Sequence, residues 1–479
     1  MHGVPPSAYV AVAAQDQITG HDNQLIVMDT AMPAARYKQL VERFAQQIRS
    51  GALLPGTRLP THRSLAQQER LALATASRVY AELESVGLVC AETGRGTFVR
   101  EISVPAGHGI DQSPTAPGML DLNFNYPELP EQAELLRSAL RNLTSAGDLD
   151  ALLRYQPHAG RPHERAIIAE HLSTRGLAVT AEQVLLVSGA QHGLTVALMS
   201  LLQAGDVIAA DALTYPGFKA IAQALQLEVL PLAPGENGPD LAAVDALCQR
   251  RKVRALYCMP TLHNPLGWVM GRGQRKQLAA LARKHDLLLI EDAAYAFLAV
   301  DPPPPLYNFA PERTLYVSGF SKSVATGLRV GYLVAPVSRV ANLERAIRAT
   351  AWNTPAMLTR ITCDWITDGT VQQLEQAKRR DAAARQQCAR RVLQGLAWQA
   401  HPNSYFLWLP LPATVRAEQV VSALLQRNVS VSSAAPFAVG DHRPQAIRLA
   451  LGSLDTARLE SALLLVKEVI DAVECGALD

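Results

Sequence analysis

The chain has 479 residues, 48% of them hydrophobic, and a formal net charge of +2. This length exceeds one ordinary domain, and the apolar content can form large cores. No apolar run is long enough to span a membrane, which excludes a membrane-spanning protein. The six cysteines are scattered without a Cys-x-x-Cys pair, which favours reduced thiols in the cytoplasm over a disulfide framework or a metal site.

Two stretches without periodicity predict the domain boundaries. Residues 1–33 form an expected extension, and their apolar stretch Tyr9–Ala14 lacks the basic flank of a signal peptide. Pro and Gly recur over residues 103–119, which is typical of an interdomain linker. The predicted domains are therefore residues 34–102 and 120–479.

The first predicted domain consists of short helices followed by a hairpin. Apolar residues recur at helical spacing over 37–48 and predict an amphipathic helix. Shorter helices are expected over 64–68 and 75–86. Strand-like residues 87–89 and 96–99 flank a polar segment that contains Gly94, which suits a two-stranded wing with its turn at that glycine.

This small domain is basic. Residues 36–100 contain ten Lys or Arg and five Asp or Glu, a net charge of +5, which leaves −3 for the rest of the chain. The asymmetry places phosphate-attracting charge on the small domain. A helix that is merely solvated can carry the same charge, so charge alone does not decide between the two interpretations.

Residues 51–66, GALLPGTRLPTHRSLA, closely resemble the start of a GntR-type winged helix-turn-helix domain, and residues 80–88 and 94–99 match its third helix and wing. The resemblance implies binding to double-stranded DNA, with Arg63 and Arg95 at phosphate or groove contacts. The full set of DNA contacts that we expect comprises Thr61, His62, Arg63, Thr75, Arg78, Arg95 and Gly96.

The start of the recognition helix departs from this family. Where the family has a run such as Ser-Arg-Thr-Thr, this chain has Ala72-Leu73-Ala74-Thr75. Alanine and leucine can contact a thymine methyl group but cannot make a bidentate contact with guanine. We therefore expect an unusual operator sequence or weak DNA binding.

In the second predicted domain, polar residues follow strand-like runs. The segment Gly189-Ala190-Gln191 links the run 184–187 to an apolar helix and forms an anion-binding helix N-terminus. Asp292 ends the run 287–292, at the expected carboxyl edge of a parallel sheet. Taken alone, Asp292 can also be a helix cap.

Lys322 follows the apolar run 315–317 in a turn of small residues, and Arg329 precedes the next run. A lysine at a strand end can hold a Schiff base to an aldehyde cofactor, because desolvation lowers the pKa of its amine. Pyridoxal phosphate also needs a buried carboxylate, which Asp292 supplies, and a cation for its phosphate, which Arg329 supplies. A solvated loop lysine is the alternative for Lys322 alone, but the order of its partners favours the cofactor.

The segment from about Leu120 to Ile470 resembles the fold type I aminotransferases over about three quarters of the chain. The resemblance implies an α/β domain with pyridoxal 5′-phosphate on Lys322 and Asp292 as its pyridinium partner. Arg448 matches the arginine that binds a substrate carboxylate, and a core-facing arginine without such a partner would be costly. The other cofactor contacts that it implies are Gly189, Ala190, Gln191, Tyr215, Asn264, Tyr295, Ser321, Arg329 and, toward the phosphate of the neighbouring subunit, Tyr155.

Two positions depart from the aminotransferase pattern. The residue three before the lysine is usually Ser or Thr, but here it is Gly319, and the phosphate loop has Ala190 where a hydroxyl is common. The loss of both hydroxyls predicts weaker cofactor binding or reduced turnover.

A GntR-type domain joined to an aminotransferase-like domain is the arrangement of the MocR subfamily of bacterial transcriptional regulators. This resemblance implies a domain-swapped homodimer that binds DNA and senses pyridoxal phosphate or a small amine or amino-acid effector. An aminotransferase with an accessory DNA-binding-like domain is the alternative. A third interpretation, a scaffold that only dimerises, is disfavoured by the intact Lys322, Asp292, Asn264, Tyr295 and Arg329.

Overall fold

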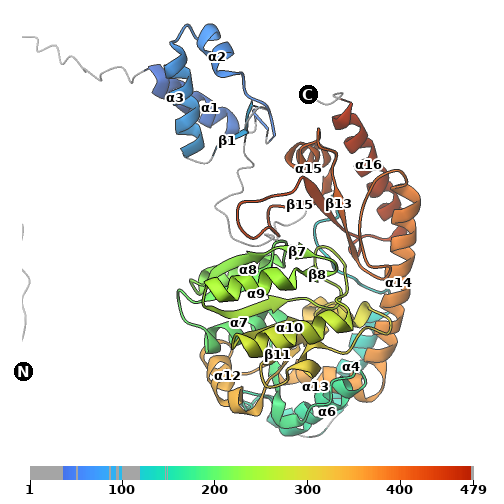
Figure 1. The fold of residues 1–479 in the computed structure, drawn as a ribbon. Coiled ribbons are helices and arrows are strands. Elements are labelled where there is room, and N and C mark those ends of the chain that lie inside the picture. The colour runs from blue at the N-terminus through green and yellow to red at the C-terminus, as the bar shows by residue number, and fades with distance from the viewer. Residues whose placement is uncertain are drawn as a thin grey trace, which may run out of the picture.

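The structure, a computed structural model, describes residues 36–49, 52–54, 56–85, 88–92, 96–99, 119–145, 147 and 149–475. Figure 1 shows a small N-terminal domain and a larger α/β domain. The predicted extension over 1–33 lies outside the described residues, as does the predicted linker over 103–119 apart from Met119.

The small domain has three helices and a hairpin: α1 (Arg36–Arg49), α2 (His62–Gln68), α3 (Leu73–Ser85), β1 (Val89–Glu92) and β2 (Gly96–Val99). The three predicted helices are confirmed, although α3 begins two residues earlier than expected because Ala, Leu and Ala favour helix. Every element contributes to one core, which contains Leu40, Phe44, Ile48, Leu65, Val79, Leu83, Val89 and Val99.

The wing is an antiparallel pair in which Val89 faces Val99 and Glu92 faces Gly96. Its first strand extends to Glu92, so the prediction that this strand ends at residue 89 was wrong. The strand continues because Cys90 and Ala91 pair with β2. The connection, with the expected turn at Gly94, falls on residues 93–95, which the structure does not describe.

The large domain is built on a seven-stranded sheet with the order β4-β12-β11-β10-β9-β5-β6. Only β12 runs antiparallel to its neighbours, β11 and β4. The strands are almost fully buried except for β6 at the edge, as expected for a sheet that is covered on both faces. Their bounds are β4 Val184–Val187, β5 Val207–Asp211, β6 Glu228–Leu232, β9 Val253–Cys258, β10 Leu288–Asp292, β11 Thr314–Gly319 and β12 Gly331–Val334.

Helices cover both faces of this sheet (Figure 1). One face packs against α7 (Ala190–Leu201), α8 (Pro216–Ala224) and α12 (Val337–Thr350). The other face packs against α6 (Pro162–Ser173), α9 (Leu241–Arg250), α10 (Arg272–Lys284) and α13 (Ala356–Thr367), and α4 (Gln132–Ser145) lies beside α13.

A C-terminal subdomain follows the long helix α14 (Thr370–Val392), which runs along the side of the molecule (Figure 1). The guanidinium of Arg385 on α14 donates to the Leu451 carbonyl at 2.6 Å and so fastens the helix to this subdomain. The subdomain contains β13 (Phe406–Pro410), α15 (Ala417–Gln426), β14 (Val429–Ser430), β15 (Ser432–Ser433), β16 (Ala446–Ala450) and α16 (Thr456–Glu474), and β14 pairs with β3 (Leu120–Asp121).

The wing of the small domain lies against the start of α15. The Arg416 guanidinium, at the N-terminus of α15, is 4.7 Å from the centre of the Phe98 ring on β2. Gly56 of the small domain lies so close to Gln419 that a methyl group on its Cα would be 2.7 Å from the Gln419 Cγ. The two domains therefore share a packed contact that includes a cation–π pair.

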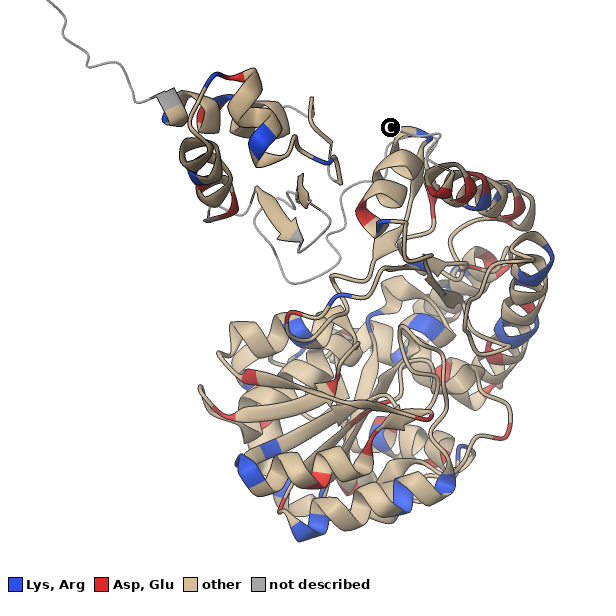
Figure 2. Cartoon of the chain, turned by 45° about the horizontal axis from the view of Figure 1, so that its top comes forward, with Lys and Arg blue, Asp and Glu red and all other residues tan. Residues whose placement is uncertain are grey.

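Within the described residues, no helix is long and apolar enough to cross a membrane. All six cysteines have free thiols. Figure 2 shows that Lys and Arg occur along the helices of the small domain, where the sequence predicts contact with phosphates.

Candidate functional site

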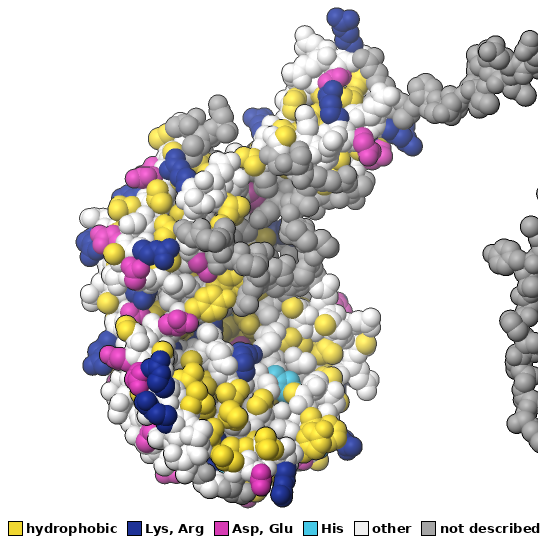
Figure 3. Space-filling view, turned by 180° about the vertical axis from the view of Figure 1, so that it is seen from behind, with side chains coloured by type: hydrophobic (Ala, Val, Ile, Leu, Met, Phe, Trp, Pro, Cys, Tyr) yellow, Lys and Arg dark blue, Asp and Glu magenta, His cyan; other side chains and the backbone are white. Residues whose placement is uncertain are grey.

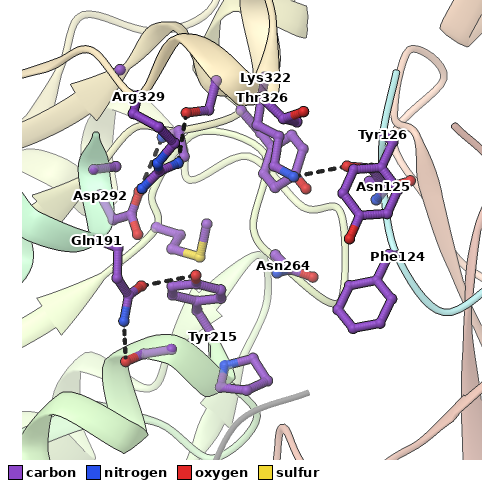
Figure 4. Close-up of a pocket in the computed structure, with 18 of the residues that line it drawn as sticks. Phe124, Asn125, Tyr126, Gln191, Tyr215, Asn264, Asp292, Lys322, Thr326 and Arg329 are labelled. Atoms are coloured by element: carbon purple, nitrogen blue, oxygen red, sulfur yellow. Dashed lines mark hydrogen bonds between the residues drawn. The ribbon is translucent and has the colours of Figure 1, made fainter. Parts of the chain in front are cut away.

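A pocket of about 730 Å³ opens beside the carboxyl ends of the parallel strands. Figure 4 shows that it is bounded on one side by the ends of the sheet strands and on the other by the segment 123–126. Of the predicted cofactor and carboxylate-binding residues, all but Gly189 and Tyr155 line it: Ala190, Gln191, Tyr215, Asn264, Asp292, Tyr295, Ser321, Lys322, Arg329 and Arg448. Gly189 precedes Ala190 and borders Arg329.

Lys322 enters the pocket from a single helical turn, Phe320–Ser323 (α11), directly after β11. Its Nζ donates to the Asn125 carbonyl at 2.8 Å, across the pocket (Figure 4). This amine is therefore oriented toward the open space of the pocket and away from bulk solvent, where an aldehyde can reach it.

Asp292 ends β10 and is 2% exposed. Its carboxylate accepts hydrogen bonds from the Tyr257 hydroxyl at 2.7 Å and from the Ala294 N–H at 3.0 Å. Burial raises the pKa of Asp292, which these two neutral donors oppose only in part. A protonated ring nitrogen would supply the cation that this carboxylate lacks among its neighbours, so the site fits pyridoxal phosphate.

An anion site lies where α7 begins. Gly189 has φ +86° and precedes the first N–H groups of the helix. The positive φ favours glycine, and a methyl group on its Cα would be 2.7 Å from Nη2 of Arg329, so the guanidinium lies directly against this backbone. Arg329 also donates to the Ser321 hydroxyl at 3.0 Å, which brings a guanidinium, a hydroxyl and helix N–H groups to one place.

Two tyrosines and two amides complete the floor of the pocket. Gln191 accepts from the Tyr215 hydroxyl at 2.9 Å and donates to the Gly217 carbonyl, which fixes Tyr215 at the start of α8 (Figure 4). Tyr295 packs edge-on against Phe406. Asn264 is 5% exposed, and its Oδ1 has no hydrogen-bond partner within the described structure. A ligand group can therefore form a hydrogen bond with this amide.

Arg448 lies on β16 and is 3% exposed. Its Nη1 donates to the Asn123 carbonyl at 2.7 Å, and its guanidinium lies 5.2 Å from the centre of the Phe406 ring and 5.8 Å from that of Phe437. Burial lowers the pKa of Arg448. Its Nε has no hydrogen-bond partner among the described residues, which leaves capacity to bind a carboxylate.

Sequence reasoning missed the wall formed by residues 123–126. Asn123, Phe124, Asn125 and Tyr126 all line the pocket, between β3 and α4. The available signal was the alternation of amides and aromatic rings directly after the short apolar start of the domain. Thr326 and Gly327 were missed as well, although they stand between Lys322 and Arg329.

Gly319 has a steric explanation. A methyl group on its Cα would lie 3.0 Å from the Val330 carbonyl oxygen and 3.3 Å from the Ala190 nitrogen. The backbone of the phosphate loop thus lies so close to the end of β11 that a side chain at position 319 would be crowded.

Lys378 on α14 lies directly behind the loop of Lys322 and is fully buried. Its Nζ donates to the Val324 carbonyl at 2.6 Å and to the Lys322 carbonyl at 3.1 Å. Burial and the nearby Lys322 lower the pKa of Lys378 to about 7. This amine fixes the backbone that carries the reactive lysine.

Tyr155 does not reach the pocket of its own chain. It is 83% exposed and, with Leu153 and Met357, lines a separate hollow of about 480 Å³. Its ring is 5.3 Å from that of Trp352. Figure 3 shows that hydrophobic side chains gather on one side of the large domain. Leu153 and Met357, which line the hollow with Tyr155, are 84% and 47% exposed. An exposed tyrosine beside such apolar side chains suits a contact between subunits, and its role there stays a prediction.

The predicted DNA contacts differ in their exposure and in the bonds that they make within the small domain. Thr61 caps α2 by accepting from the Ser64 N–H, and His62 bonds the Ser77 hydroxyl, so both hold the helix-turn-helix together. Arg63 and Arg78 are exposed, and Arg78 also lies 4.3 Å from the centre of the Tyr37 ring. Gly96 begins β2 beside Arg58, Thr75 is half-buried in α3, and Arg95 lies outside the described residues.

The apolar start of the recognition helix is exposed. Leu73 has 48% of its surface accessible, and Ala72 and Ala74 are exposed as well. These side chains are therefore not part of the domain core, and they can contact thymine methyl groups as the sequence predicts.

Two family models match the chain. The model for aminotransferase class I and II matches residues 117–464, and the model for bacterial regulatory proteins of the gntR family matches residues 36–99. Together they reach from α1 into α16. The arrangement expected from the sequence, a GntR-type domain followed by an aminotransferase-like domain, is confirmed.

Relatives with both domains and relatives named as enzymes are found. The chain is 27% identical to the HTH-type pyridoxine biosynthesis transcriptional regulator PdxR of Corynebacterium glutamicum, over 94% of this chain and 99% of that protein. It is 27% identical to the HTH-type transcriptional regulator YdeF of Bacillus subtilis, over 91% and 94%. It is 28% identical to the 2-aminoadipate transaminase of Thermus thermophilus, over 71% and 87%.

The fold has close counterparts among solved structures. The α-aminoadipate aminotransferase LysN of Thermus thermophilus, complexed with N-(5′-phosphopyridoxyl)-L-leucine, superposes with a TM-score of 0.68 at 24% identity. The match covers 75% of this chain and 94% of LysN. The fold type I aminotransferase architecture predicted from the sequence is therefore confirmed.

The steric account of Gly319 gives a prediction. Gly319→Ala should destabilise the protein by about 1–3 kcal/mol, since the added methyl group crowds the Val330 carbonyl. Gly273→Ala is the matched control, because Gly273 lies inside α10 and nothing lies within 4 Å of an added methyl group. That change should stabilise the protein by about 0.4–1 kcal/mol. Denaturant unfolding measures both, and equal effects of the two changes would contradict the account.

Proposed function

Because the chain belongs to the aminotransferase class I and II family and carries a gntR-family domain at residues 36–99, we propose that it is a transcriptional regulator that depends on pyridoxal phosphate. The N-terminal domain binds double-stranded DNA, and the aminotransferase-like domain senses the cofactor or a small amine or amino acid. The observation that carries this proposal is a pocket lined by ten of the predicted cofactor and carboxylate-binding residues, in the same chain as a winged helix-turn-helix fold.

The pocket residues hold the cofactor in the proposed site. Lys322 would supply the amine that binds the aldehyde, and Asp292 would pair with the ring nitrogen. Arg329, Ser321 and the first N–H groups of α7 bind the phosphate. The remaining contacts are Tyr215 on the ring face and Asn264 and Tyr295 at the phenolic oxygen. Bound pyridoxal phosphate supplies an aldehyde that reacts reversibly with primary amines.

Sensing requires that a ligand change the relative energies of two arrangements of the domains. With the cofactor bound, an effector amine would compete with the Lys322 amine for the aldehyde, and Arg448 would bind the carboxylate of the effector. Arg448 stands on β16 of the subdomain whose helix α15 contacts the wing through Arg416 and Phe98. The effector site and the DNA-binding domain therefore meet the same subdomain, which is a physical route for coupling.

A second candidate function is amino-acid transamination, with the small domain as an accessory. The intact lysine, aspartate and arginine of the pocket favour it, as does 28% identity to a transaminase. The two functions differ in what an amine does. Turnover at about 1 s⁻¹ or faster without any change in DNA affinity would establish the enzyme.

The first prediction concerns the cofactor. Purified protein should show the visible absorption band of a lysine-bound pyridoxal phosphate, and Lys322→Ala should lose that band while its circular dichroism stays unchanged. Lys276→Ala, an exposed lysine on α10, should keep the band. A wild-type protein that stays colourless with added cofactor would contradict the proposed function.

The second prediction concerns assembly. We propose a homodimer in which Tyr155 of each protomer contacts the other, and in which each small domain, besides the contact of its wing with α15 of its own chain, lies over the large domain of its partner. Leu153→Asp should weaken the dimer, because Leu153 is 84% exposed on the same hollow as Tyr155. Light scattering at micromolar concentration measures this change. A wild-type protein that is monomeric with cofactor bound would refute the dimer.

The third prediction joins the two domains. An effector should change operator affinity by roughly 5–150-fold, which corresponds to a typical coupling of about 1–3 kcal/mol. Arg448→Ala should remove this change for carboxylated effectors and leave basal DNA binding intact, whereas Arg63→Ala should weaken basal binding. Fluorescence anisotropy with a labelled fragment of the protein's own upstream region measures both. If pyridoxal phosphate alone produces the full shift, the cofactor is the signal and Arg448 has no part in it.

A further inference from the structure

The charges of the pocket restrict the chemistry of the effector. Among the described residues that line the pocket, the charged side chains are those of Asp292, Lys322, Arg329 and Arg448. The proposed function assigns the first three to the ring nitrogen, the aldehyde and the phosphate of the cofactor. Only Arg448 remains to bind an anionic group of the effector.

The neighbours of Arg448 orient its guanidinium so that it can bind one carboxylate. The Asn123 carbonyl and the rings of Phe406 and Phe437 fix its guanidinium. Asp121 is the carboxylate whose charge acts on Arg448. It already accepts hydrogen bonds from the Asn123 and Phe124 N–H groups, at 2.7 and 3.2 Å. A buried guanidinium is costly without an anionic partner, and a ligand carboxylate would offset that cost.

The wall opposite the cofactor residues is aromatic and uncharged. The rings of Phe124 and Tyr126 are stacked, with centres 5.9 Å apart and planes at 27°. Figure 4 shows both rings on the side of the pocket that faces Lys322 and Asn264. A side chain that extends from an amine bound near Lys322, with its carboxylate on Arg448, meets these rings.

Besides Asn123 and the Tyr126 hydroxyl, the wall contains the buried amide of Asn125. Asn125 is 3% exposed, its Oδ1 accepts from the Gly452 N–H at 3.2 Å, and its Nδ2 has no hydrogen-bond partner in the described structure. The backbone donor fixes the orientation of the amide, so the atom left without a partner is a neutral donor. A neutral donor adds no cation that could neutralise a second acid group.

We infer that the effector is a primary amine with one carboxylate and an uncharged, mainly apolar side chain, of the class of the branched aliphatic and aromatic amino acids. This inference rests on the proposed function, because the cofactor must occupy the other three charged groups. A dicarboxylic amino acid would place its second carboxylate against Phe124 and Tyr126 without a cation, which disfavours its binding.

The test is direct binding to the cofactor-loaded full-length protein. Calorimetry and the visible absorption band are followed during titration with L-leucine, L-phenylalanine, L-glutamate and L-2-aminoadipate. Leucine or phenylalanine should bind at least about tenfold more tightly than either diacid. Arg448→Ala should abolish this binding while the band of the cofactor remains.

Variants of the wall test the origin of the selectivity. Phe124→Ala should weaken binding of the apolar amino acids by about tenfold. Phe124→Arg should favour glutamate over leucine, because it supplies the missing cation. Unchanged circular dichroism and an unchanged cofactor band show that each variant is folded and loaded.

The possible results separate this inference from the proposed function. Tighter binding of glutamate or aminoadipate by the wild type would overturn the inference, whether a cation comes from this chain or from a partner subunit. Cofactor-loaded protein that binds none of the four amino acids would overturn it as well. Leucine or phenylalanine binding without any change in DNA affinity would support it and refute the regulator. Protein that takes up no cofactor would overturn both.

Discussion

The arrangement of the pocket depends on a close approach of backbone at the end of the large sheet. Gly331 on β12 lies so near to Gly189 that a methyl group on its Cα would be 2.8 Å from the Gly189 carbonyl carbon. Gly319 is similarly close to Val330 and to the start of α7. Three glycines therefore let the phosphate loop, the lysine strand and the antiparallel strand β12 meet without side chains between them. Any wider spacing would move Arg329 away from the helix N-terminus that it faces.

The sequence predicts which site residues lie together where they follow strands, because their order along the chain determines their place at the edge of the sheet. Parallel strands end at a common edge, so Asn264 after β9, Asp292 at the end of β10 and Lys322 after β11 converge once the strands are recognised. Local pattern also predicts the helices of the small domain. The same pattern places the start of α3 two residues too late, because the exposed Leu73 does not belong to the helically spaced apolar residues that form the core.

Other parts of the site could not be predicted, for two physical reasons. The segment 123–126 faces residues about 200 positions further along the chain, and its position is set by distant bonds such as that from the Tyr126 N–H to Ser453. No local periodicity encodes such contacts. Tyr155 is different, because its place in the site follows only from the family resemblance, and its side chain is exposed in the single chain. The bounds of the wing strands likewise follow from their pairing and not from the turn residues.

The helix α14 has a consequence for how the two ends of a ligand are held. Lys378 on this helix fixes the backbone of Lys322, and Arg385, seven residues later, is bonded to the chain just after the strand of Arg448. Seven residues of α-helix span about 10 Å. This part of α14 therefore sets the spacing between Lys322, the proposed anchor of the amine, and Arg448, the proposed anchor of the carboxylate. A bend in α14 would alter the distance between the two anchors. A ligand whose amine and carboxylate are spaced differently would in turn strain the helix.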